Sequence, residues 1–144
     1  MAAGYRNRLA EQAAAFVDGW YRTGDVGQLD DDGFLHVLGR AADLGAVDGT
    51  AVTPTAVEDT LCRLASVRYA AIAPDRGTGR WVVAVAPWPG ATVDARECRA
   101  AVAVEHGAAT AAALVVVAVD EVPLTEQGKP DRPAIRRLGA RSAA

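Results

Sequence analysis

The chain has 144 residues, of which 51% are hydrophobic and 23% are charged, which suits a folded domain and excludes both a disordered segment and a large multidomain enzyme. The net charge of -3 argues against a nucleic-acid-binding domain, and the longest apolar run, from Ala111 to Val119, is far shorter than the roughly 20 residues of a membrane span. The first residues contain no hydrophobic signal region, so a cytoplasmic location is expected.

The first 42 residues predict a helix followed by a β-hairpin. The expected elements are a helix over residues 8–16 with Asn7 as its N-cap, and strands over residues 20–26 and 34–38 joined at the turn Asp32-Gly33. One helix and one hairpin are too little structure to be stable alone. This segment is therefore expected to belong to a larger body.

The remaining residues predict a small α+β domain, in which a sheet is backed by two helices. The expected elements are a short hairpin around Asp48-Gly49, a helix from Thr53-Pro54 to about Ser66, strands over residues 67–73 and 81–86, a helix over 93–106, a strand over 114–119 buried on both faces, and a short terminal helix after a polar loop. The predicted fold class for the whole chain is α+β, with a small sheet flanked by helices and preceded by a helix and a β-hairpin.

Residue types that often form metal or hydrolytic sites are not clustered in the sequence. Cys62 and Cys98 lie far apart, with no His or Cys at metal-ligand spacing, so both are expected to be small core residues and no metal site is predicted. His36 and His106 have no nucleophile placed beside them, so no hydrolytic triad is predicted. The acidic run over residues 30–32 is expected to be a solvated turn.

Asp25 and Arg40 are candidate binding residues at one end of the first hairpin. Asp25 follows Thr23-Gly24, where its carboxylate can accept two hydrogen bonds from a vicinal diol such as a ribose. Hairpin register would bring Arg40 towards Asp25, and this pair would suit a sugar and a phosphate. An ordinary cross-strand ion pair is the alternative that the residues alone favour.

Lys129 is the only lysine among fifteen basic residues, the other fourteen being arginines. An ammonium group is a compact point charge that a guanidinium does not replace, so either chance or a chemical requirement explains its presence. Lys129 follows Gly128 in a loop, but it lacks the GxxxxGK[ST] pattern of a phosphate-binding loop and precedes a proline.

Three motifs occur together and in order: GWYRTGDVGQLDDDGFLHVLGR followed by Asp43, then GTAVTPTAVED, then VDEVPLTEQGKPDRPAIR. They closely resemble the C-terminal part of the adenylate-forming ligases, a superfamily of acyl-CoA and aryl-CoA synthetases, peptide-synthetase adenylation domains and luciferases. The first and last motifs are highly specific, the middle one is degenerate, and the resemblance covers nearly the whole chain. It implies that residues 1–42 end the large N-terminal domain and that residues 43–144 form the mobile C-terminal lid domain.

The resemblance implies a role for four residues. Asp25 would hold the ribose hydroxyls of ATP, Arg40 would assist at the ribose and phosphates, and Asp43 would be the hinge about which the lid swings. Lys129 would bridge the carboxylate substrate and the α-phosphate while the acyl-AMP forms. Two anions at close range repel by about 4 kcal/mol at an effective dielectric constant near 20, and a flexible ammonium suits that position better than a guanidinium.

Two departures from the family pattern fall on the side of thioester formation. Asp48-Gly49 stands where the family usually has a glycine pair that lines the pantetheine tunnel, so Gly49 is a weak candidate for the tunnel, and Val47 replaces a basic residue. The segment ATAAAL, residues 109–114, replaces a basic, proline-containing stretch. The carboxylate of Asp48 would also oppose an anionic coenzyme A.

The resemblance implies that the complete system is an AMP-forming acid–thiol ligase. It would activate a carboxylic acid with ATP and Mg²⁺ as acyl-AMP, and pass the acyl group to coenzyme A or to the phosphopantetheine of a carrier protein. The isolated chain is expected to be inactive without the large N-terminal adenylating domain, in cis or in trans. The alternatives are a free-standing lid acting in trans, an adenylation-only system with a decayed thioester half, and a non-catalytic interaction module that retains the fold.

Overall fold

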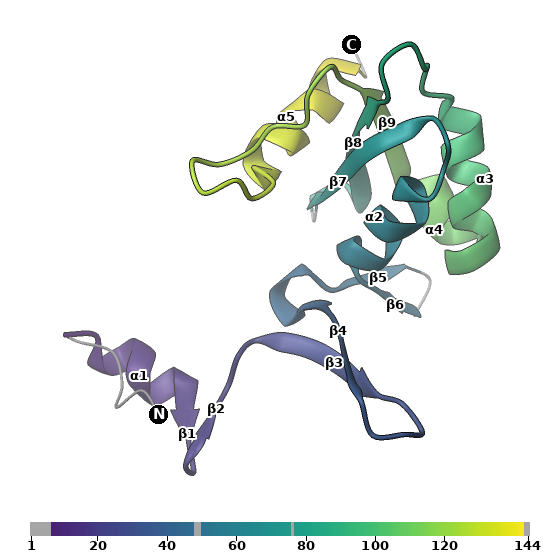
Figure 1. Ribbon diagram of the computed structural model, residues 1–144. Helices are drawn as coiled ribbons and strands as arrows, with labels where there is room; N and C mark the ends of the chain where they lie inside the picture. Colours follow the sequence, from purple (N-terminus) through teal and green to yellow (C-terminus); the bar gives the residue numbers. More distant parts are fainter. Residues whose placement is uncertain (1–6, 48–49, 76, 143–144) are drawn as a thin grey trace. The chain divides into compact units, whose positions relative to one another are not determined.

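The computed structural model describes residues 7–47, 50–75 and 77–142. The chain divides into two compact units, Met1–Ala42 (unit 1) and Asp43–Ala144 (unit 2), whose elements are labelled in Figure 1. None of the described helices combines the length and the apolar character that a bilayer span requires.

The described part of unit 1, residues 7–42, contains one short helix and two separate hairpins. Its elements are α1 (Leu9–Ala15), β1 (Phe16–Val17), β2 (Trp20–Tyr21), β3 (Asp25–Leu29) and β4 (Leu35–Arg40). β1 pairs with β2 and β3 pairs with β4, both antiparallel. The prediction of one continuous strand over residues 20–26 is wrong, because Gly24 has a φ of +75° and turns the chain between β2 and β3.

The N-terminus of α1 also differs from the prediction. Arg8 is the N-cap and makes no side-chain capping hydrogen bond, whereas Asn7 has a φ of +57°. A capping side chain needs an extended backbone at its own position, and the left-handed conformation of Asn7 does not provide it.

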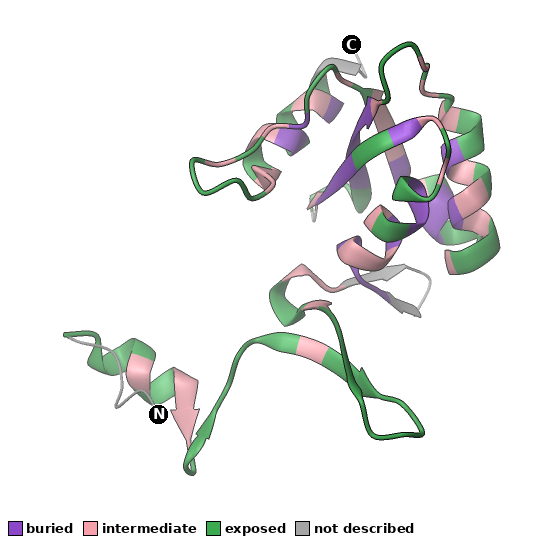
Figure 2. Ribbon diagram, viewed as in Figure 1, coloured by how far each residue is buried: buried purple, intermediate pink, exposed green. Residues whose placement is uncertain are grey.

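The described residues of unit 1 include none that is buried, as Figure 2 shows by its colouring. Large apolar side chains are exposed instead, among them Trp20 at 78%, Phe34 at 67% and Leu35 at 64%. Unit 1 therefore has no apolar core formed by its own described side chains.

Unit 2 is built around a three-stranded sheet, which confirms the α+β class with helices flanking a small sheet. Its elements are β5 (Gly45–Val47), β6 (Thr50–Val52), α2 (Pro54–Cys62), β7 (Val67–Asp75), β8 (Arg80–Pro87), α3 (Ala95–His106), α4 (Ala108–Ala113), β9 (Leu114–Ala118) and α5 (Arg132–Ser142), after a 3₁₀ turn at Ala41–Asp43. The order is β7-β8-β9, with β7 antiparallel and β9 parallel to β8, and β5 and β6 form a separate hairpin.

The start of α2 follows directly from its sequence. The hydroxyl of Thr53 accepts a hydrogen bond from the backbone N–H of Ala56 at 3.2 Å, and Pro54 occupies the first helical position. The predicted start is confirmed, while the helix ends at Cys62, earlier than the predicted Ser66.

Both faces of the sheet are covered by helices, because alternate residues of β7 and β8 enter two separate apolar clusters. On one face Ile72 and Val83 pack with side chains of α2, α3 and α4. On the other face Ala71 and Ala84 pack with Ile135 of α5. Figure 1 shows α5 on the side of the sheet opposite to α3 and α4, so the prediction of two backing helices is incomplete.

Strand β9 is an edge strand and is less buried than predicted. Only Leu114 is buried, and the next three residues are half-buried. The apolar run that precedes it forms the helix α4, which was not predicted. A strand paired on one side only leaves part of its surface open to solvent.

The two cysteines differ in burial. Cys98 on α3 is 1% exposed and belongs to the core as predicted, whereas Cys62 is exposed and its predicted core position is wrong. Leu61 points into the core, and the next residue of a helix is turned about 100° away from it.

Candidate functional site

Asp25 and Arg40 meet at one end of the β3–β4 hairpin in unit 1. The register places Asp25 opposite Arg40, and Asp25 Oδ1 lies 2.9 Å from Arg40 Nη1. The pairing expected from hairpin register is therefore confirmed. Both side chains are accessible, at 36% for Asp25 and 60% for Arg40.

Thr23, in the turn before β3, forms hydrogen bonds with both members of this pair. The backbone N–H of Asp25 donates to Thr23 Oγ1 at 3.0 Å, and Arg40 Nη1 donates to the carbonyl of Thr23 at 2.6 Å. The N–H of Ala41 donates to the carbonyl of Gly24 at 2.8 Å, which closes the end of the hairpin. The arrangement presents a carboxylate and a guanidinium side by side, a geometry that suits a diol next to a phosphate.

Asp43 lies at the first position of unit 2 and ends the 3₁₀ turn at Ala41–Asp43. Its Oδ2 lies 3.5 Å from Arg132 Nε of α5. The carboxylate of the expected hinge residue is thus bound to unit 2 by an arginine.

Lys129 is exposed in a closed loop of unit 2 that leads into α5. The N–H of Thr125 donates to the carbonyl of Lys129 at 2.7 Å, and the N–H of Lys129 donates to Thr125 Oγ1 at 3.3 Å. Gly128 has a φ of +75°, which glycine adopts without strain, and its N–H donates to the carbonyl of Thr125 at 2.9 Å. The loop holds the lysine backbone and leaves its side chain in solvent.

Asp48 and Gly49, which were expected at a thioester tunnel, lie outside the described residues. The alanine-rich segment over residues 109–114, which replaces the basic stretch of the family, forms most of α4 and the first residue of β9.

No protein-family model matches the chain. The chain is 36% identical over 146 residues to the medium/long-chain-fatty-acid–CoA ligase FadD8 of Mycobacterium tuberculosis, a match that covers 94% of this chain and 25% of that ligase. It is 38% identical over 138 residues to a salicylyl-CoA synthase / salicylate adenylyltransferase of a Streptomyces species. This match covers 92% of this chain and 25% of that protein. It is also similar in structure to the amide bond synthetase McbA of Marinactinospora thermotolerans, with a TM-score of 0.82 and 35% sequence identity. The superposition covers 94% of this chain and 28% of McbA.

The chain is homologous to the C-terminal part of the adenylate-forming ligases. It spans about a quarter of the length of the two CoA ligases described here.

Sequence reasoning missed two residues of unit 2, Arg132 and Glu58, although both lie inside the motifs quoted from the sequence. Arg132 comes three residues after Lys129, and its Nη1 lies 3.3 Å from Glu58 Oε1 of α2. The motif strings contained the signal, but the contact between residues 74 positions apart requires the fold.

Two histidines have partners that the sequence did not predict. His106 Nε2 lies 2.7 Å from Thr60 Oγ1, and Glu105 Oε2 lies 2.9 Å from the same hydroxyl. Thr60 lies on α2 and is 2% exposed, whereas Glu105 and His106 lie on α3, so these contacts join the two helices. The buried hydroxyl of Thr60 is not accessible as a nucleophile. His36 Nε2 lies 2.7 Å from Asp30 Oδ2, and this contact lowers the pKa of Asp30.

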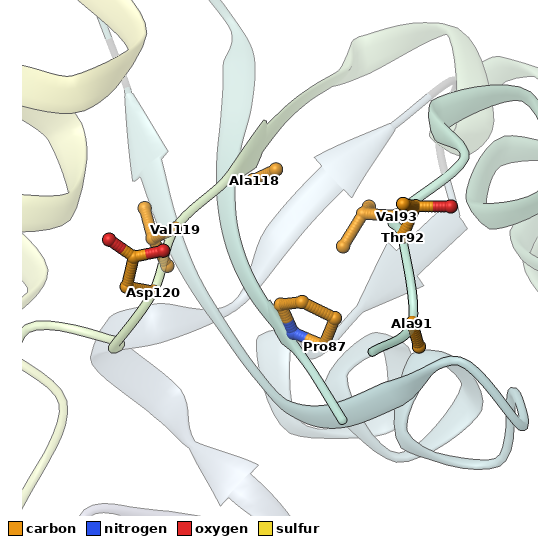
Figure 3. Close-up of a pocket in the computed structure, with 7 residues that line it drawn as sticks. All are labelled: Pro87, Ala91, Thr92, Val93, Ala118, Val119 and Asp120. Atoms are coloured by element: carbon orange, nitrogen blue, oxygen red, sulfur yellow. The ribbon is translucent and has the colours of Figure 1, made fainter. Parts of the chain in front are cut away.

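A pocket of about 420 Å³ lies at the carboxyl ends of β8 and β9 in unit 2. Figure 3 shows Thr92 and Asp120 on opposite sides of it, with Pro87 and Ala118 between them. None of the expected site residues is among those that line this pocket.

Proposed function

We propose that this chain forms the lid side of the active site of an AMP-forming acid ligase, which a large adenylating domain completes in cis or in trans. One observation carries the proposal. A chain that matches an acid–CoA ligase over 94% of its length combines the Asp25–Arg40 pair with its single lysine, Lys129, in a closed loop. Because the chain spans a quarter of that ligase, the acid-binding pocket is assigned to the large domain.

The first step is acyl-AMP formation. A carboxylate oxygen of the acid attacks the α-phosphorus of ATP, and the bond to pyrophosphate breaks. Asp25 accepts hydrogen bonds from the ribose hydroxyls, and Arg40 contacts the ribose and phosphates. Lys129 offsets the repulsion between the two reacting anions, which is about 4 kcal/mol at an effective dielectric constant near 20.

Mg²⁺ is assigned to the ATP phosphates and to the large domain. The described part of this chain has no group of three or more His, Cys, Asp and Glu side chains that could hold a metal ion. The side chains of this chain would therefore act on the ribose, the phosphates and the carboxylate.

The second step is transfer of the acyl group to a thiol. The sulfur of coenzyme A, or of the phosphopantetheine of a carrier protein, attacks the acyl carbonyl, and AMP leaves. Asp43 would be the hinge for the movement of the lid between the two steps. Its position at the boundary between the units supports this role. Gly49 would line the path of the thiol.

A second candidate is an adenylation system that transfers its acyl group to an amine instead of a thiol. The structural similarity to an amide bond synthetase favours it. So do Asp48 and the alanine-rich segment over residues 109–114, which stand where the family has thioester residues. In this case the nitrogen of an amine attacks the acyl carbonyl, and AMP again leaves.

A chimera tests both candidates. The full 144-residue chain replaces the C-terminal quarter of the fatty-acid–CoA ligase relative, and ATP–pyrophosphate exchange is measured with a fatty acid, followed by product formation with coenzyme A or an amine. The proposal expects exchange well above that of the large domain alone, with the native relative as the positive control. A folded chimera that exchanges no faster than the large domain alone would make the chain a non-catalytic module.

A further inference from the structure

The loop that carries Lys129 is attached directly to the first turn of α5. The backbone N–H of Asp131 donates to the carbonyl of Pro123 at 2.9 Å, which closes the base of the loop. Asp131 Oδ1 accepts a hydrogen bond from the N–H of Ala134 at 2.9 Å, so this side chain caps the start of the helix. The position of the lysine backbone therefore depends on where α5 begins.

Arg132 anchors that first turn to the rest of unit 2. Its Nη1 donates to the carbonyl of Ile72 on β7 and lies 3.3 Å from Glu58 Oε1 on α2. Its Nε lies 3.5 Å from Asp43 Oδ2. One guanidinium thus connects α5, the central sheet, α2 and the residue at the unit boundary.

The anchor lies in a partly desolvated place. The side chain of Arg132 is 25% exposed and that of Glu58 is 15% exposed. Burial raises the pKa of Glu58, and this effect outweighs the hydrogen bond from the N–H of Ile72 and the attraction of Arg132, which both lower it. Removing the guanidinium would leave the Glu58 and Asp43 carboxylates without the cation that they share.

We infer that Arg132 is a positioning residue for Lys129: it holds the first turn of α5 against Ile72 and Glu58, and so fixes the loop from which the lysine reaches the reacting anions. Its contact with Asp43 ties the same helix turn to the hinge. A planar guanidinium donates in several directions at once, which a single ammonium cannot do with the same geometry. The inference deepens, and rests on, the proposed role of Lys129 in adenylation.

The kinetic test uses the chimera described above, with pyrophosphate exchange as the assay. Arg132→Ala is expected to lower kcat on the order of 10²-fold, because a misplacement of about 1 Å has an effect of that size. The KM values for ATP and acid should stay close to those of the parent. Arg132→Lys should recover part of the loss, and Arg136→Ala, an exposed arginine of the same helix, should leave kcat unchanged. Equal losses in Arg132→Ala and Arg136→Ala would overturn the inference.

A second test does not depend on catalysis. Amide hydrogen exchange in the 144-residue chain is expected to be faster at Thr125 and Gly128 in Arg132→Ala, with protection unchanged at Val83 in the core strand. Unchanged exchange in the loop overturns the inference even if the chimera is active. If Arg132→Ala does not fold, Glu58→Gln takes its place, since it keeps an acceptor for the N–H of Ile72 and should loosen the loop less. A parent chimera without exchange activity rejects the proposed function, and the loop amides then decide the positioning role alone.

Discussion

Unit 1 and unit 2 differ in what their apolar side chains contact. In unit 2, Leu61 and Ile72 are completely buried among residues of three helices and a sheet. In unit 1, Trp20 and Phe34 are 78% and 67% exposed, and none of the described residues is buried. Under the proposed function, the large adenylating domain would cover the apolar side chains that unit 1 exposes, whereas unit 2 buries its own.

The difference also separates the proposed functional residues. The Asp25–Arg40 pair lies on the unit without a core, and Lys129 lies on the unit with one. The Asp25–Arg40 pair, proposed to bind the ribose, would therefore depend on the large domain for its rigidity, whereas the lysine loop depends on α5 and the sheet of its own unit. Variants in unit 2 can accordingly be tested for stability and activity separately.

The largest expected effect is on folding itself. A fragment of residues 43–144 should fold and unfold cooperatively in urea, because it contains both apolar clusters. A fragment of residues 1–42 should lack stable structure, because a helix and hairpins without buried side chains are marginal in water. Circular dichroism of both fragments, with the full chain as reference, measures this. Cooperative melting of the shorter fragment would show that unit 1 is stable without buried side chains.

The next effect is chemical. Lys129→Ala should lower the rate of adenylation in the chimera by about 10²- to 10³-fold, the effect of removing one preorganised charge-stabilising group. Its side chain is exposed, so the free energy of unfolding of residues 43–144 should change by less than about 0.5 kcal/mol. Pyrophosphate exchange and urea unfolding measure the two quantities. Lys129→Arg is the matched variant, and undiminished exchange in Lys129→Ala would remove the role given to this lysine.

Elements with a local chemical signal were predictable from the sequence. The N-cap Thr53 followed by Pro54 marks the start of α2, and short apolar runs bounded by turn residues mark β7 and β8. The break at Gly24 and the edge position of β9 were not predictable in this way. A single glycine between two β-forming segments fits either a continuous strand or a turn, and strand order depends on contacts between distant parts of the chain.

In the candidate site too, local contacts were predictable from the sequence and contacts between distant residues were not. The Asp25–Arg40 pair follows from hairpin register, which is local, and Lys129 stands out because the other basic residues are arginines. The contacts of Arg132 with Glu58 and Ile72 were not predictable, because they join residues 74 and 60 positions apart. Residue type and spacing do not specify which carboxylate an arginine will meet.

A third and smaller effect tests the contact of α5 with the sheet. A Cβ atom at Gly139 would lie 2.5 Å from Val82 Cγ2. Gly139→Ala should therefore destabilise residues 43–144 by about 1–3 kcal/mol through overpacking. The better helix propensity of alanine offsets up to about 1 kcal/mol of this loss. Urea unfolding measures the change. Val82→Ala combined with Gly139→Ala should relieve the clash, and purely additive effects of the two substitutions would argue against this contact.

The smallest expected effect is a change in how stability depends on pH, and two glutamates of unit 2 should act in opposite directions. Burial raises the pKa of Glu58, so the folded state binds the proton more tightly than the unfolded state, and the contribution of Glu58 to stability is lost as the pH rises through the folded pKa. Hydrogen bonds from Arg63 and Thr60 lower the pKa of Glu105, so its contribution is present above the unfolded value of 4.5 and is lost as the pH falls. The stability of Glu58→Gln should therefore fall less with rising pH than that of the parent. The stability of Glu105→Gln should rise less with rising pH than that of the parent. Urea unfolding of residues 43–144 at a series of pH values on both sides of 4.5 measures both slopes, and changes of the same sign in the two variants would contradict the assignment of burial to one carboxylate and hydrogen bonding to the other.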